Sequence, residues 1–491
     1  MKPINISLFC IILSIFFISC SSNDDNYSND DNYVNTPQED NSPPSNFSVT
    51  IQNVSHDKAE ISWSESFDPD NEPVKYDIYV DDILIASNLD SLNYTINNLN
   101  ELSEYTGKVI AKDTSENETS ENFSFQTIKY YLKFVKYYDF GPNKRNGRPY
   151  NILKTEDNGF LISGFYSDDG VNLSLFAFKF DYDGNMLWQR YYPFNFENGS
   201  FEKTKVIKYL TGYLLVGNAY VLHLDSNGNI IWQKTIDSYY DSGYANSQIN
   251  SIDIDNLNNI YVVGGRGVLS DDYAEEGVIT KLDQSGNILW ERTYNTNYRN
   301  LLVDVTINSS NELIILGSSG TDNQNQFWVI KTDTNGNIIW QNTIGNGYGF
   351  PRQIIPTNDG NYVFAGYSWG AYDISNGYLY KISDEGSILW EKLADISTIY
   401  SITQLADNSL VASGYDDGSL THITYNKFDS EGNSIWNKEY MEEYTYLYGR
   451  YITSDPDGGF RIISNRDKIY FYPGDNPKLM LLKFDPDGNC Q

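Results

Sequence analysis

The sequence has little of the chemistry on which most catalytic and metal-binding sites depend. Three cysteines and three histidines occur in 491 residues, and no pair of histidines has the close spacing of a zinc site. No Gly-x-Ser-x-Gly turn, phosphate-binding loop or dinucleotide-binding glycine motif is present. The sequence therefore predicts a non-enzymatic protein that needs neither a metal nor another cofactor.

Basic residues are also scarce. The 34 lysines and arginines are outnumbered by 66 aspartates and glutamates, which gives a formal net charge of −32. Proteins bind nucleic acid largely by neutralising its phosphates with lysine and arginine. No basic patch interrupts the acidic surplus, so we exclude nucleic acid as a partner.

The sequence lacks a long hydrophobic run outside its N-terminus. The run from Ile4 to Ile18 is too short for a lasting membrane span and predicts a secretory signal at residues 1–19. It ends in Phe17-Ile-Ser-Cys20, which resembles the lipobox of bacterial lipoproteins. The resemblance implies cleavage before Cys20 and a lipid on Cys20 that anchors the protein to a membrane. An ordinary signal peptide with an incidental cysteine is the alternative.

The segment after Cys20 is polar, acidic and interrupted by proline. Residues 20–45 contain too few apolar residues to form a core, so we expect a disordered tether. The acidic run also resembles the surface-export signal of lipoproteins from the Bacteroidota. That resemblance implies a lipid-anchored protein of the outer membrane, exposed at the cell surface, although a charge run is also typical of any solvated segment.

Residues 46–128 alternate short apolar runs with turn signals, which is typical of an antiparallel sandwich. Trp63 lies in one predicted strand, and Leu102 and Tyr105 precede another. These residues resemble the core tryptophan and the tyrosine corner of the fibronectin type III family. The resemblance implies a spacer or adhesion module in which the Tyr105 hydroxyl bonds to the backbone upstream.

An eight-residue motif returns through the rest of the chain. Its first copy is Asp181-Tyr-Asp-Gly-Asn-Met-Leu-Trp188, and successive copies follow at intervals of 44 to 58 residues. The motif glycines are Gly184, Gly228, Gly286, Gly336, Gly386, Gly432 and Gly488. Short strands with this spacing indicate a radial all-β array. We therefore predict a seven-bladed β-propeller over residues 130–491, with strand 131–139 completing the last blade because the seventh copy ends before its tryptophan.

The motif has two interpretations, a calcium loop or a hairpin turn. An EF-hand loop needs further oxygen ligands and a glutamate at its twelfth position, whereas here an apolar strand follows at once. Aspartate, glycine and asparagine instead favour a tight turn, and we expect the tryptophan to pack between blades. The motif resembles the tryptophan-docking repeat of quinoprotein propellers and of outer-membrane assembly lipoproteins. No quinone site with calcium ligands is recognisable, so a dehydrogenase is not supported.

Function is less well defined by the sequence. Flat aromatic side chains in connecting segments suit sugar rings or protein partners. Trp369, which lies outside the repeated tryptophan position, and its neighbours Tyr367 and Tyr372 are the candidate ligand contacts. We expect recognition or adhesion of a polysaccharide or protein through one propeller face. A carbohydrate-active enzyme using loop carboxylates and an envelope-assembly scaffold remain alternatives.

Overall fold

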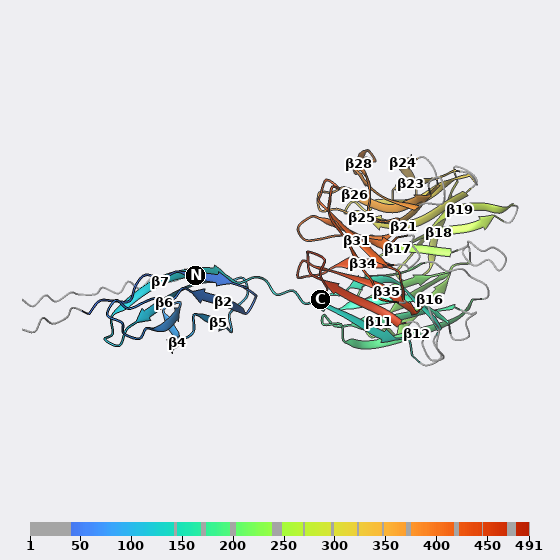
Figure 1. Cartoon of the computed structure of the whole chain (residues 1–491). Helices are drawn as coiled ribbons and strands as arrows, with labels where there is room; N and C mark the ends of the chain where they lie inside the picture. Colours follow the sequence, from blue (N-terminus) through green and yellow to red (C-terminus); the bar gives the residue numbers. More distant parts are fainter. Residues whose placement is uncertain are drawn as a thin grey trace, which may run out of the picture. The chain divides into compact units, whose positions relative to one another are not determined.

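A computed structural model describes residues 41–141, 145–167, 173–196, 203–237, 248–268, 271–295, 299–321, 324–345, 348–369, 375–416, 422–443, 445–468 and 478–490. The chain divides into two compact units, Met1–Tyr130 and Tyr131–Gln491. The regular elements in the described ranges are all β-strands (Figure 1). No helix in these ranges is long and apolar enough to span a bilayer. Cys20 and most of the expected tether lie outside the described residues.

The first unit is a sandwich of two antiparallel sheets, with strand orders β1-β2-β5 and β4-β3-β6-β7. Its strands are β1 (Val49–Gln52), β2 (Lys58–Trp63), β3 (Lys75–Val80), β4 (Ile83–Leu89), β5 (Asn93–Asn97), β6 (Glu104–Lys112) and β7 (Glu118–Gln126). Trp63 is buried between the sheets against Tyr76, with ring centroids 5.5 Å apart. The Tyr105 hydroxyl accepts a hydrogen bond from the Asn100 amide at 2.8 Å, which confirms the expected tyrosine corner.

The second unit is a seven-bladed propeller, as the sequence predicts. The strands within each blade pair antiparallel, and single parallel bridges join blades 3, 4 and 5 into one twelve-stranded sheet. Blade 1 consists of β9 (Arg145–Lys154), β10 (Phe160–Ser167), β11 (Leu173–Phe180) and β12 (Met186–Phe196), and blade 2 of β13 (Thr204–Tyr209), β14 (Gly212–Gly217), β15 (Tyr220–Leu224) and β16 (Ile230–Thr235). Blade 3 consists of β17 (Gln248–Ile254), β18 (Ile260–Val268), β19 (Asp271–Leu282) and β20 (Ile288–Tyr294), and blade 4 of β21 (Arg299–Ile307), β22 (Leu313–Thr321), β23 (Gln324–Thr332) and β24 (Ile338–Ile344). Blade 5 consists of β25 (Tyr348–Pro356), β26 (Tyr362–Trp369), β27 (Ser375–Ile382) and β28 (Ile388–Leu393), and blade 6 of β29 (Thr398–Gln404), β30 (Leu410–Tyr415), β31 (Ile423–Phe428) and β32 (Ser434–Tyr440). Blade 7 consists of β33 (Thr445–Leu447), β34 (Tyr451–Ser454), β35 (Phe460–Lys468), β36 (Lys478–Phe484) and β8 (Phe134–Asp139).

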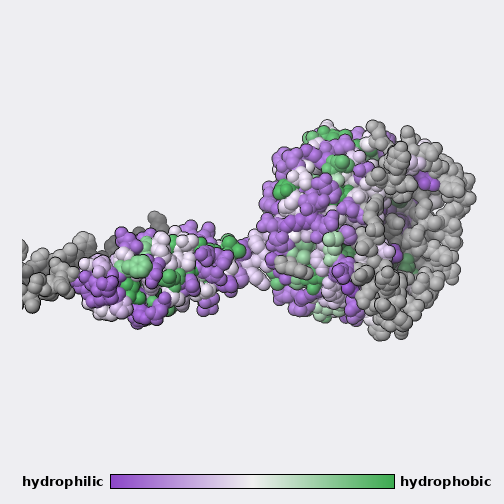
Figure 2. All heavy atoms as spheres, viewed as in Figure 1, coloured by the Kyte–Doolittle hydropathy of each residue, from purple (hydrophilic) through white to green (hydrophobic). Residues whose placement is uncertain are grey.

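Burial follows the position of a strand within its blade. The second and third strands are nearly continuous apolar runs, and every residue of β14 is buried. Both faces of such a strand are covered by neighbouring blades, so the strand needs no polar face. The outer strand β16 instead exposes Ile230 and Ile231 and buries Trp232 partly. Figure 2 shows hydrophilic residues over most of the described propeller surface in that view, as the acidic composition requires.

The ends of the propeller are joined in one sheet. Strand β8 pairs antiparallel with β36, and Phe134 lies opposite Lys483 in the register. In blade 1 the same register places Trp188 opposite Lys179. Phe134 therefore occupies the tryptophan position that the seventh copy of the motif lacks, and the last blade has an outer strand from the start of the unit.

Each outer-strand tryptophan docks on the motif glycine of the next blade. A Cβ atom added at Gly228 would lie 2.8 Å from the ring of Trp188, closer than carbon atoms normally approach. The same contact recurs for Trp232 on Gly286, Trp290 on Gly336, Trp340 on Gly386, Trp390 on Gly432, Trp436 on Gly488 and Phe134 on Gly184. The prediction that the tryptophan packs between blades is confirmed, and the glycine is needed at the seam as well as in the turn.

The turn hydrogen bonds confirm that the motif is a structural joint. Asp181 accepts from the backbone amide of Asn185 at 2.7 Å through one carboxylate oxygen and from its side-chain amide at 2.9 Å through the other. Gly184 has a φ of +79°, which favours glycine. Both carboxylate oxygens are thus occupied within the turn, as hairpin chemistry requires.

In six of the seven described blades a buried lysine, which the sequence did not reveal, faces the docking ring of the outer strand, which is a tryptophan in five blades and Phe134 in the seventh. It pairs with a carboxylate at the turn between the first two strands of its own blade; the pairs are Lys179–Asp157, Lys281–Asp255, Lys331–Glu312, Lys381–Asp359, Lys427–Asp407 and Lys483–Asp457. Burial opposes the charge of Lys331, but hydrogen bonds to Asp384 and Glu312 outweigh it and raise its pKa. In blade 2, His223 replaces the lysine and packs between Tyr209 and Trp232, and its burial lowers its pKa.

We predict that Gly386→Ala destabilises the propeller more than Gly360→Ala. Both glycines belong to blade 5 and have φ values of +87° and +80°, so both substitutions carry a backbone cost of about 1–2 kcal/mol. A Cβ at Gly386 would also lie 2.9 Å from Trp340, whereas one at Gly360 has no atom within 4 Å. Overpacking adds a further ~1–3 kcal/mol to the loss for Gly386→Ala. Urea unfolding followed by tryptophan fluorescence measures the difference, and equal losses would contradict the docking account.

Candidate functional site

The two faces of the propeller differ in the connections that they carry. On one, which we call the turn face, the connections within blades are five-residue turns such as 181–185 and 357–361, apart from the two-residue turn 210–211. On the other, which we call the loop face, segments such as 168–172, 197–202, 370–374 and 469–477 join the second strand to the third, or one blade to the next. These four segments lie outside the described residues, so the site is built from the strands beneath them.

A set of arginine and tyrosine side chains lies where the inner strands of blades 5, 6, 7 and 1 approach the loop face. The Arg352 guanidinium, from β25, lies over the rings of Tyr367 and Tyr400 at 5.2 and 4.8 Å. The Arg450 guanidinium, just before β34, lies over the rings of Tyr400, Tyr448 and Tyr150 at 5.2, 5.1 and 4.9 Å. We call these six residues the arginine–tyrosine ladder. Tyr400 has an arginine within cation–π distance on either side.

The contacts of the two arginines differ. Arg352 donates through Nη2 to the Tyr367 hydroxyl at 3.2 Å. Arg450 is 9% exposed, and its Nε is buried without a hydrogen-bond partner. No carboxylate among the described residues forms an ion pair with Arg450. Burial raises the pKa of nearby Asp467 and outweighs the hydrogen bond from Asn465 and the positive charges of Arg148 and Arg450.

Below the ladder, hydrogen bonds fill the propeller axis. A polar side chain on one inner strand accepts from a backbone amide of the next inner strand; the acceptor–donor pairs are Asn151–Val206, Ser251–Val305, Asp304–Ile354, Gln353–Ile402 and Ser401–Ile452. Lys205 donates to Ser251 and Asp304 at 2.9 and 2.8 Å. A cavity of about 20 Å³ there, lined in part by Arg352 and Lys203, is of a size for a single water molecule.

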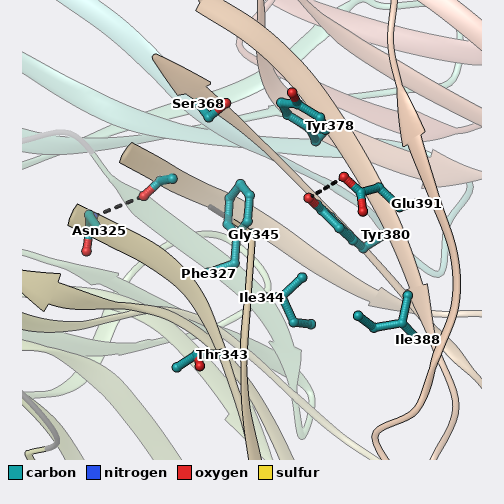
Figure 3. Close-up of a pocket in the computed structure, with 11 residues that line it drawn as sticks. Asn325, Phe327, Thr343, Ile344, Gly345, Ser368, Tyr378, Tyr380, Ile388 and Glu391 are labelled. Atoms are coloured by element: carbon teal, nitrogen blue, oxygen red, sulfur yellow. Dashed lines mark hydrogen bonds between the residues drawn. The ribbon is translucent and has the colours of Figure 1, made fainter. Parts of the chain in front are cut away.

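A groove of about 390 Å³ opens between blades 4 and 5 (Figure 3). Phe327, Tyr378 and Tyr380 supply its aromatic walls, and Asn325 and Glu391 supply its polar groups. The Tyr380 hydroxyl donates to Glu391 at 3.0 Å, and burial together with this carboxylate raises the tyrosine pKa. Asn325 donates to the Gly349 carbonyl at 3.0 Å, while its Oδ1 is buried without a partner.

The seam at the groove differs from two other seams in one side chain. Tyr192 and Tyr294, each four residues after the tryptophan of its outer strand, donate to Gly228 and Gly336 in the next blade at 2.8 and 2.6 Å. The corresponding residue of blade 4 is Ile344, which lines the groove, and Asn342 donates to Gly386 of blade 5 instead, at 2.7 Å.

The predicted ligand contacts fare unequally. Tyr367 belongs to the ladder, where it is buried and its ring stacks on Phe350 with centroids 4.9 Å apart. Trp369 ends β26 at the loop face, but its side chain lies outside the described residues, as does all of Tyr372. The structure describes the side chain of one of the three residues, Tyr367, and places it beside Arg352, which the sequence analysis did not single out. That these residues contact a ligand stays a prediction. Within the described ranges, no three histidine, cysteine or acidic residues are grouped to hold a metal.

The fold defines a two-domain all-β protein. Residues 42–126 match the family model of the fibronectin type III domain. Among solved structures, the Pan2 WD40 domain of Neurospora crassa is 10% identical with a TM-score of 0.48, and the match covers 72% of this chain and 95% of that chain. The Dos1 propeller is 9% identical with a TM-score of 0.43, over 72% and 95% of the two chains. A protein of unknown function from Dyadobacter fermentans is 10% identical with a TM-score of 0.43, over 72% and 98%. A comparison with curated proteins finds no match.

Proposed function

We propose that this protein is a lipid-anchored, non-enzymatic recognition protein of the bacterial outer membrane, which binds glycans through the loop face of its propeller. The single observation that carries the proposal is the groove between blades 4 and 5. Its aromatic walls provide flat apolar surfaces of the kind that pack on sugar rings. Asn325 Oδ1 and the Glu391 carboxylate provide acceptors for sugar hydroxyl groups.

The groove favours binding over hydrolysis. Most glycosidases use two carboxyl groups on either side of the scissile bond. Glu391 is the one carboxylate among the described residues that line the groove, and it already accepts from Tyr380. A second carboxylate at hydrogen-bonding distance from the same sugar is therefore not provided by these walls, and binding without turnover is the function that the groove supports.

The N-terminal features fit the same proposal. A lipid on Cys20 and a tether over residues 20–45 would hold the domains away from the membrane. The fibronectin type III domain has its own hydrophobic core, which suits a spacer.

Removal of one groove tyrosine is expected to weaken glycan binding. Tyr378 is half-buried, and its loss removes one aromatic wall, so Tyr378→Ala should lower affinity for a bound polysaccharide about 10-fold or more, as expected for a lost stacking contact of ~1.5 kcal/mol. Tyr220→Ala is the matched control, because Tyr220 is also half-buried on the third strand of its blade but lies in blade 2. A polysaccharide array followed by calorimetry on the best binder measures both variants. Product release from that polysaccharide would identify an enzyme, and binding only to extracellular proteins would overturn the glycan proposal.

Replacement of Cys20 should release the protein from the membrane. Cys20→Ser removes the thiol that would carry the lipid, so the variant should lose incorporation of a palmitate analogue and move to the soluble fraction. Cys490→Ser is the control, and it should remain labelled and membrane-bound. Equal labelling of the Cys20→Ser variant and the parent chain would contradict lipidation at this position.

A further inference from the structure

We propose that the arginine–tyrosine ladder is a binding site for the carboxylate of an acidic sugar, with Arg450 as its principal anion ligand. The inference rests on the proposed function, since it names the chemical class of glycan that the loop face selects.

The first observation is a buried cation without an anion. Arg450 is nine-tenths buried, yet no ion pair or side-chain hydrogen bond holds its guanidinium within the described parts of the chain. A buried charge is costly unless it is paired and hydrogen-bonded. The rings of Tyr150, Tyr400 and Tyr448 offset part of this cost at the guanidinium faces, but the buried Nε has no acceptor.

The second observation is the grouping of cationic side chains in an acidic protein. Lys203 and Arg352 lie beside the same axis, and Lys203 donates to the Arg352 carbonyl at 3.2 Å. Among the nearby described acids, Asp304 pairs with Lys205 at 2.8 Å, and Asp467 accepts from Asn465 at 2.6 Å while its Oδ1 is buried without a partner. In a chain with a net charge of −32, Arg450 thus forms no ion pair with a described carboxylate.

The shape of the site favours a carboxylate. A guanidinium binds planar carboxylates through parallel N–H bonds, and its plane is fixed here by the tyrosine rings. The rings of Tyr400 and Tyr448 are half-buried, so each retains exposed surface beside the arginine. An acidic sugar offers both partners at once, a carboxylate for Arg450 and a ring for the tyrosines.

The ladder and the groove lie on opposite sides of blade 5. Ser368 of β26 lines the groove, and the adjacent Tyr367 contacts Arg352 in the ladder. Successive side chains of a strand point to opposite faces, so a single strand separates the two sites. One glycan can therefore contact both, with a neutral unit in the groove and an acidic unit on the ladder.

The test uses the chain from residue 21, which retains every described residue, and two matched probes. One is an oligoglucuronate, and the other is the same oligosaccharide after reduction of its carboxyl groups to primary alcohols. Calorimetry at low and high salt should show at least 10-fold tighter binding of the acidic form, and the difference should shrink as salt rises. Equal affinity for the two probes would overturn the inference.

Arg450→Gln should reduce binding of the acidic probe to the level of the reduced probe, and Arg450→Lys should recover only part of it, because lysine keeps the charge but not the planar fork. Arg292→Gln is the control. Arg292, like Arg450, lies over an aromatic ring, that of Trp290, but it is exposed and does not belong to the ladder. Melting temperatures identify a variant that fails to fold, and Arg450→Lys then carries the test.

Two further results separate the inference from the proposed function. If Tyr378→Ala weakens both probes while the carboxylate has no effect, glycan binding stands and the ladder proposal fails. If neither probe nor any arrayed glycan binds, both fail. Arg450-dependent binding of a peptide through its C-terminal carboxylate, without binding of the oligoglucuronate, would also overturn the acidic-sugar assignment.

Discussion

The propeller depends on one contact repeated at each seam, in which an aromatic ring of one blade lies on the turn glycine of the next. The contact couples local to global structure, because the residue that gives the turn its positive φ is also the residue that leaves room for the ring. A change at such a glycine therefore affects the turn and the seam together. The buried lysine beneath the ring joins the same seam to the first turn of its own blade.

This arrangement explains why the two faces carry different kinds of sequence. The turn face is constrained by the docking contacts, so its turns keep one length and one residue pattern almost throughout. The loop face carries none of these contacts, and its connections range from two to twelve residues. Variation is thus confined to the face where the ladder and the groove lie, and a rigid frame that holds variable loops is a common arrangement for recognition.

Much of the fold could be predicted from the sequence because its signals are local and repeated. The turn motif, the tryptophans and the tyrosine corner at Tyr105 can each be recognised within a short stretch of sequence. The buried lysines could not be predicted, since a lysine in a strand is usually solvated and its carboxylate partner lies about twenty residues away. The arginine–tyrosine ladder could not be predicted from the sequence either, because Arg352, Arg450 and Tyr150 come together only when the first and last blades meet in the folded propeller. The sequence singles out Tyr367 for its aromatic ring, and the structure shows in addition that Arg352 donates a hydrogen bond to its hydroxyl.

Native-state hydrogen exchange on the mature chain tests the central claim most directly, namely that the ring is closed by β8 acting as a full outer strand. If Phe134 replaces the missing tryptophan, the β8 amides bonded to β36 should exchange as slowly as the amides of β28 that bond to β27, and both sets should open together. Rapid exchange of β8 while the other outer strands stay protected would contradict the account, because it would show a loosely attached end rather than a seventh seam.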